Sequence, residues 1–167
     1  NDKTQAMLSG SVFDRDGLVK ETNYRKINIR SNVTHNFDDH FTAVMNFAYT
    51  NAHSTTPQNL TGGNRGKSII GASYGAPPTL TPYNDDGSYR NLLLDYPFMP
   101  NVLINPMNYL YETSQKHKAE VLEINGSLAY KPIKGLTLKT SLALQSTNSR
   151  DDGYKTMKII NSSNSAW

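Results

Sequence analysis

Residues 135–144 read GLTLKTSLAL, and this stretch indicates the fold. Successive side chains of an extended strand point to opposite faces. One face would carry Leu136, Leu138, Leu142 and Leu144, and the other Thr137, Lys139, Ser141 and Ala143. The preceding residues 121–130 alternate in the same way, and a short turn separates the two stretches. We therefore predict a hairpin of two long amphipathic strands.

The composition limits the class of protein. The chain has 167 residues, of which 37% are hydrophobic, and a formal net charge of +3 with scattered basic residues. Such a small and dispersed charge gives no reason to expect a nucleic-acid partner. No run of about 18 apolar residues occurs, which excludes a membrane-spanning helix but not spanning strands, because half of each such strand is polar. Cysteine is absent, which removes disulfides and thiolate chemistry.

Five segments alternate between apolar and polar residues and are predicted to be strands. They comprise residues 6–13, 24–37, 40–50, 121–130 and 136–144. Short turns at Asp38-Asp39 and at residues 131–135 lie on one side of these strands, and long connections lie on the other. Outer-membrane barrels have this asymmetry. The expected fold class is all-β: an antiparallel meander of about five long amphipathic strands, part of a large transmembrane β-barrel, with one long extracellular loop carrying a short helix.

The predicted organisation follows from these strands. We expect barrel strands within residues 1–50, the long extracellular loop at 51–118, a barrel hairpin at 119–148 and the start of a second extracellular loop at 149–167. Asn105 followed by Pro106 is typical of an N-cap and a first helical position, and predicts a helix of about two turns through Glu112. Aromatic residues near both strand ends fit the two girdles of a membrane barrel, although aromatics are common in any strand. These aromatics are Phe37, Phe41 and Tyr130 near the short turns, and Tyr24 and Tyr49 near the long loops.

Four stretches, taken in order, carry a family resemblance. They are residues 16–33, with DGLVK and YRKINIRSNV; residues 76–89, from APP to YNDDGSY; Asn105-Pro106; and residues 126–136, with GSLAY and PIKGL. Together they resemble the barrel of SusC/RagA-type TonB-dependent transporters, and the likeness covers residues 8–149. The resemblance implies a Bacteroidetes outer-membrane importer of oligosaccharides or peptides, working with a SusD-like surface lipoprotein and with TonB.

The chain departs from that family because it lacks the plug domain, the TonB box and most of the barrel. About five strands cannot close a spanning barrel, which needs at least about eight, and would leave an apolar face and two open edges. We therefore expect a piece of a longer protein whose apolar face meets the lipid bilayer. TonB would act through parts absent from this chain.

The long loop carries the residues expected to meet a ligand. Aromatic faces together with amide, carboxylate and guanidinium groups suit a sugar or a peptide, through stacking and directional hydrogen bonds. The residues predicted to contact the substrate or the SusD-like partner are Tyr74, Tyr83, Asn84, Asp85, Tyr89, Arg90 and Tyr96. The alternative is that these tyrosines pack the loop onto itself or against the partner.

No arrangement of side chains indicates catalysis, so the chain is not expected to be an enzyme, and no cofactor or metal is expected. The histidines lack metal-ligand spacing. Residues 62–68 superficially match a phosphate loop, but Thr61 stands where the first glycine is required. Residues 84–87, NDDG, lack the ligand pattern of an EF-hand loop and are interpreted as a turn.

A second class of function stays open, a soluble β-sandwich module that binds carbohydrate. In that protein the apolar side chains would face each other across two packed sheets. In a membrane barrel they would form one outward band. The side chains that distinguish the two are Ile27, Ile29, Leu122, Ile124, Leu138 and Leu142.

Overall fold

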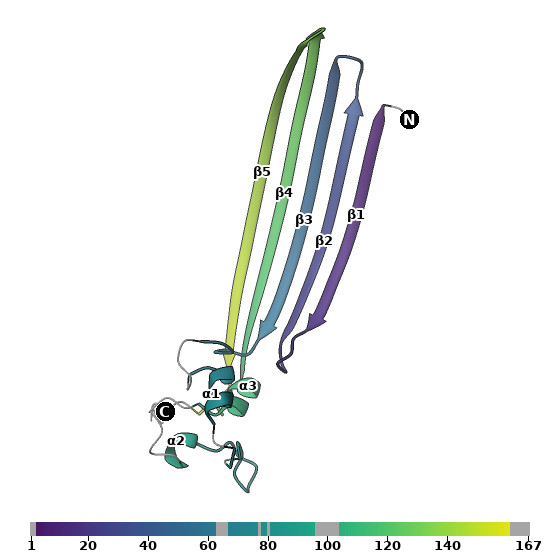
Figure 1. The fold of residues 1–167 in the computed structure, drawn as a ribbon. Helices are drawn as coiled ribbons and strands as arrows, with labels where there is room; N and C mark the ends of the chain where they lie inside the picture. Colours follow the sequence, from purple (N-terminus) through teal and green to yellow (C-terminus); the bar gives the residue numbers. More distant parts are fainter. Residues whose placement is uncertain (1–2, 63–66, 77, 80, 96–103, 161–167) are drawn as a thin grey trace. The chain divides into compact units, whose positions relative to one another are not determined.

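The computed structural model describes residues 3–62, 67–76, 78–79, 81–95 and 104–160. These residues form five strands and three short helices. The strands are β1 (Thr4–Asp16), β2 (Asn23–Asn36), β3 (Phe41–Thr56), β4 (Thr113–Ile133) and β5 (Leu136–Lys155). They lie in one sheet in the order β1-β2-β3-β4-β5, so each strand pairs with its neighbour in sequence (Figure 1). The predicted antiparallel meander of long strands is confirmed, and it is compatible with a segment of a β-barrel.

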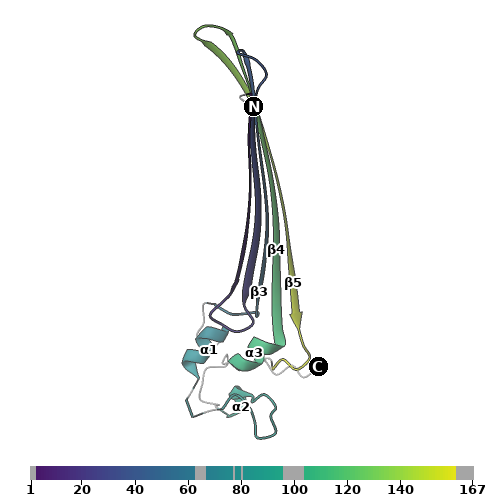
Figure 2. The same cartoon turned by 90° about the vertical axis from the view of Figure 1, so that its right-hand side faces the viewer.

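The chain divides into two compact units. The first, called the sheet unit, comprises residues 1–15, 24–53 and 117–150. The second, called the loop unit, comprises residues 16–23, 54–116 and 151–167. Turned by 90°, the strands of the sheet unit form a single layer (Figure 2). Segments far apart in the sequence therefore fold together in the loop unit.

Four strands extend by two residues or more beyond their predicted ends, among them β1, which spans Thr4–Asp16 rather than residues 6–13. β3 continues past residue 50 to Thr56, β4 begins at Thr113 rather than at 121, and β5 runs to Lys155 rather than to 144. The added residues are polar on both faces; residues 145–152, for example, read QSTNSRDD. Hydropathy alternation gives no signal in such a stretch, whereas backbone pairing continues through it. The strands are consequently longer than the roughly 9–11 residues that cross a bilayer.

The two short turns have local chemical causes. In the β2–β3 turn, the Asp38 carboxylate accepts hydrogen bonds from the backbone amides of His40 and Phe41, each at 2.8 Å. These bonds hold the pKa of Asp38 below its ordinary value. The β4–β5 turn places Gly135 at φ +91°, a left-handed conformation that suits glycine. At the same end of the sheet the rings of Phe41 and Tyr130 stack with centroids 4.3 Å apart, which confirms that these two predicted aromatics group together.

Three short helices order the described part of the loop unit. They are α1 (Ile69–Gly75), α2 (Leu92–Asp95) and α3 (Pro106–Glu112). The predicted helix is confirmed as α3, with Asn105 as its N-cap and a proline at its first turn. α1 and α2 were not expected, because IIGASYG and LLLD are too short to show a helical period. None of the described helices is long and apolar enough to cross a membrane.

The loop unit has a small hydrophobic core of its own. α1 and α3 pack against each other. The buried side chains are Ile69, Ala72, Leu92, Ile104 and Tyr109, with Leu60 and Ile159 packed against them. This core joins the segment after β3, all three helices and the segment after β5.

Candidate functional site

One face of the sheet unit carries paired polar side chains. The Asn28 side chain donates to Ser11 Oγ at 3.1 Å and accepts from Thr50 Oγ1 at 3.0 Å. Two further pairs continue the row, Asn32 with Asn46 and Thr42 with Asn36. Neighbouring strands therefore satisfy each other's hydrogen-bonding groups on this side, called here the amide face.

The opposite side, called the apolar face, carries exposed apolar side chains. Contacts establish which residues share it, since Thr4 bonds His35 at 2.7 Å and Phe41 stacks on Tyr130. Because faces alternate with a period of two, the same face holds Leu8, Val12, Ile29, Met45 and Leu128, all of them exposed. On β5 the alternating leucines are also exposed, Leu138 by 55% and Leu142 by 66%. The apolar side chains of the sheet are thus largely open.

This arrangement does not favour the soluble β-sandwich. The described strands form one sheet, with no second sheet among the described residues. Leu138 and Leu142 are exposed, Ile29 is exposed as well, and Ile27, Leu122 and Ile124 are only partly buried. The inner face of a sandwich would bury all six.

In the loop unit, residues 82–90 form a closed hairpin that groups five of the predicted ligand-contacting residues. The backbone amide of Arg90 donates to Pro82 O at 3.0 Å, and that of Asn84 donates to Ser88 O at 2.8 Å. The rings of Tyr83 and Tyr89 lie 5.4 Å apart, centroid to centroid. The residues brought together are Tyr83, Asn84, Asp85, Tyr89 and Arg90. We call this segment the 82–90 hairpin.

The two remaining predicted residues lie elsewhere. Tyr74 belongs to α1, outside the hairpin, and its side chain is 88% exposed. Tyr96 lies outside the described residues. Arg90, within the hairpin, already has a counter-charge, because its Nε lies 3.6 Å from Asp95 Oδ2. That pairing reduces the positive charge Arg90 offers to a ligand.

Asn105 ties the hairpin to α3. Its side-chain amide donates to Pro82 O at 2.7 Å and to Arg90 O at 2.9 Å, the two ends of the hairpin. Its Oδ1 accepts from the backbone amides of Met107 and Asn108, as an N-cap does. The residue is 3% exposed, so one buried side chain both begins the helix and closes the hairpin.

Glu112 connects the hairpin to the ends of two strands. Its carboxylate accepts from the Tyr89 hydroxyl at 3.0 Å and from the Thr156 hydroxyl. Its carbonyl accepts from the Thr156 backbone amide at 2.9 Å. Burial and this bond to a carboxylate raise the pKa of Tyr89 to about 12. The hairpin is therefore held at its phenol as well as at its backbone.

Asn108 and Thr113 complete a hydrogen-bonded network of the loop unit that also contains Asn105 and Glu112. We call this network the frame. Asn108 is fully buried; it donates to Lys158 O at 3.0 Å and accepts from the Ile160 backbone amide at 2.8 Å. Thr113 accepts from the Gln58 backbone amide at 2.9 Å. Sequence reasoning missed both residues, because an asparagine within a short helix gives no sign that its partners lie about 50 residues away. Only Asn105 had a local signal, the proline that follows it.

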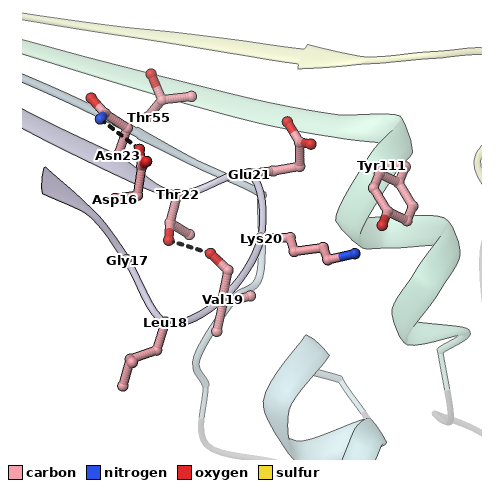
Figure 3. A pocket seen from close by; sticks show the side chains of 10 residues that line it. All are labelled: Asp16, Gly17, Leu18, Val19, Lys20, Glu21, Thr22, Asn23, Thr55 and Tyr111. Atoms are coloured by element: carbon pink, nitrogen blue, oxygen red, sulfur yellow. Dashed lines mark hydrogen bonds between the residues drawn. The ribbon is translucent and has the colours of Figure 1, made fainter.

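Two hollows are lined by described residues of the loop unit. One has a volume of about 530 Å³ and adjoins the hairpin; its lining is Asp86, Gly87, Ser88, Tyr89, Lys158 and Ile160. The other has a volume of about 690 Å³ and is lined by the loop at 16–23 together with Thr55 and Tyr111 (Figure 3). We call it the 16–23 hollow. Residues 16–20 were noted only for the family resemblance, and no site was predicted there.

The chemistry of these groups suits binding. Phenols, amides, carboxylates and ammonium groups line the hairpin and the hollows. Within the described residues, no three histidine, aspartate or glutamate side chains gather as metal ligands would. The expectation that no metal is bound stays a prediction.

Comparison with known proteins gives one informative match. No protein-family model matches the chain. TonB-dependent receptor P3 of Formosa agariphila is 29% identical over 163 residues, which cover 96% of this chain. The chain spans 16% of the length of that relative. It is therefore similar, along nearly all of its length, to one segment of a TonB-dependent receptor.

Proposed function

We propose that this chain forms part of the wall and an outer loop of a TonB-dependent importer in the bacterial outer membrane. The observation that carries the proposal is the apolar face, which lies opposite the paired side chains of the amide face. Soluble proteins seldom leave so large an apolar surface open, whereas lipid solvates it. The amide face would then line the polar interior of the barrel. Similarity to TonB-dependent receptor P3 supports the same class.

The finer assignment rests on the resemblance to SusC/RagA-type transporters. We propose barrel strands at 1–50 and 119–148 and extracellular loops at 51–118 and 149–167. The partners would be TonB, acting through other parts of the receptor, and a SusD-like surface lipoprotein. The cargo would be an oligosaccharide or a peptide, and transport would be non-catalytic: binding at the outer face, then energised displacement of a plug.

The 82–90 hairpin is the proposed contact for substrate or for the lipoprotein. Tyr83 and Tyr89 offer ring faces, and the exposed Asn84 and Asp85 offer hydrogen-bonding groups beside them. Bonds to Asn105 hold both ends of the hairpin. A preformed element loses less conformational entropy on binding than a flexible one, which favours recognition. Tyr74, Arg90 and Tyr96 belong to the same proposal.

Cysteine labelling tests the membrane assignment, because the chain has no cysteine of its own. Leu138→Cys and Leu142→Cys would be compared with Lys139→Cys and Ser141→Cys on the opposite face of β5. The protein would be produced from its own gene, with any cysteine outside these residues replaced. In isolated outer membranes a water-soluble maleimide should label the second pair and spare the first.

The same membranes supply the control. After denaturation all four cysteines should react equally, which shows that each variant was present. Equal labelling of all four before denaturation, or recovery of the protein without membranes, would contradict the barrel assignment.

A further inference from the structure

We propose that the 16–23 hollow binds ligands carrying both a positive and a negative charge, such as short peptides with free termini. This inference rests on the proposed function, since it selects the substrate class of the same importer. It adds a binding site apart from the 82–90 hairpin.

The loop that builds the hollow is closed by its own hydrogen bonds. The backbone amide of Gly17 donates to Thr22 O at 2.9 Å, and the Thr22 hydroxyl donates to Val19 O at 2.5 Å. Asn23 donates to the Asp16 carboxylate at 3.0 Å. The hollow therefore has a preformed wall, which lowers the entropy that a ligand must overcome.

Glu21 lies in a strained conformation at the rim. Its φ of 62° is left-handed, which costs a residue with a side chain roughly 1–2 kcal/mol. The bonds across the loop, from Gly17 to Thr22, hold the backbone there. Strain of this kind is often retained where it sets the direction of a functional side chain. Here it places a carboxylate at the hollow.

The hollow carries charges of both signs: the Asp16 carboxylate accepts a hydrogen bond from Asn23 in the loop, whereas Lys20 and Glu21 are left to face a ligand. Lys20 and Glu21 both line it and are exposed. Neither has an ion-pair partner within 4.0 Å among the residues that the structure describes. The Lys20 side chain extends from the loop toward Tyr111 (Figure 3). A ligand with one charge of each sign would complement the two groups together.

The remaining lining fits a small amphipathic ligand. The Tyr111 ring is 41% exposed, so its surface is open to stacking, and Thr55 adds a hydroxyl. The volume of about 690 Å³ falls within the range of roughly 300–1,000 Å³ for small-molecule sites. A neutral sugar would leave both charges without partners as it displaced their water. The observations therefore favour a zwitterionic ligand.

Tyr111 also connects this hollow to the rest of the frame. It belongs to α3, and the N-cap of α3 is Asn105, which closes the 82–90 hairpin. One short helix thus carries a wall of the hollow at one end and an anchor of the hairpin at the other. Both ligand-contacting elements of the loop unit depend on α3.

The test is calorimetry on the intact detergent-purified protein with three probes: tetra-alanine with free termini, its N-acetylated and C-amidated counterpart, and maltotetraose. We expect the free peptide to bind most tightly. Lys20→Gln and Glu21→Gln should each weaken its binding by roughly two- to fivefold at low ionic strength, the range of one exposed ion pair. Lys67→Gln, an exposed lysine outside the hollow, is the matched control and should change nothing.

The results of this calorimetry, taken with the cysteine labelling, distinguish failure of the zwitterion proposal from failure of the importer assignment. Equal affinity for the free and the capped peptide, unchanged affinity in both hollow variants, or preferential binding of maltotetraose would overturn the proposal. All three variants replace exposed side chains, and their thermal unfolding should match that of the wild type. If the peptide does not bind while cysteine labelling still alternates along β5, only this inference fails. If labelling is uniform, the importer assignment itself fails.

Discussion

Replacing Asn108 with alanine tests how the loop unit is held together. The Asn108 amide is fully buried and makes two bonds to the chain that follows β5, to Lys158 O at 3.0 Å and from the Ile160 amide at 2.8 Å. Alanine removes both and leaves a carbonyl and an amide without their partners. Each loss costs about 1–1.5 kcal/mol at partly exposed groups. The local free energy of opening should therefore fall by about 2–3 kcal/mol, which raises the opened fraction roughly 30- to 150-fold.

Limited trypsin digestion measures this opening, because Lys158 lies within the released segment. When opening and closing are faster than cleavage, the rate follows the opened population. Cleavage at Lys158 should accelerate by the same factor in Asn108→Ala. Asn84→Ala, at an exposed asparagine whose side chain bonds only within the 82–90 hairpin, should leave the rate within about twofold. An unchanged rate in Asn108→Ala would show that the amide does not anchor this segment.

Three further predictions concern the sheet, a turn and a tyrosine. Leu138→Lys places a charge on the apolar face, which costs about 2–4 kcal/mol near the bilayer midplane, and should lower the yield of folded protein in outer membranes. Ala143→Lys, on the other face of β5, should leave the yield unchanged. Gly135→Ala should destabilise the β4–β5 turn by about 1–2 kcal/mol in urea unfolding, because φ is +91° there. Gly126→Ala is the control and should not destabilise the protein, because an added Cβ meets nothing within 4 Å. Equal unfolding midpoints for the two variants would refute the left-handed turn. The pKa of Tyr89 is raised from 10.0 to about 12, so the stability that it contributes is complete below pH 10 and is lost as the pH rises to about 12. Tyr89→Phe should remove that loss. A tyrosinate absorbance titration of the two proteins measures the pKa of Tyr89.

Local chemistry made much of the fold predictable. The Asp38 turn, the Gly135 turn and the start of α3 at Pro106 are each encoded within about four residues, and the structure has all three. The alternation of residues 136–144 predicted β5, because side-chain alternation is likewise a property of neighbouring residues. The far end of β5 was not predictable, because residues 145–155 are polar on both sides and only pairing with β4 keeps them extended.

The frame of the loop unit was not predictable, because it depends on contacts between distant segments. Asn105 was identified as an N-cap, yet its bonds to Pro82 and Arg90 become visible only once the chain is folded. Asn108 and Glu112 gave no signal, since each is an ordinary polar residue in a short helix. The prediction that Tyr83 and Tyr89 contact a ligand used composition alone. Their grouping in one hairpin is a finding of the structure.

The way Asn105 holds the 82–90 hairpin has a consequence for how such proteins diverge. Both bonds end on the carbonyl oxygens of Pro82 and Arg90, groups that every amino acid supplies. Mutations between these positions leave both attachments intact, and only a change at Tyr89 removes a third one, the bond from its hydroxyl to Glu112. Residues at the tip of this hairpin can therefore be substituted without compensating changes at Asn105. Related proteins could in this way change what the hairpin recognises and keep the same frame.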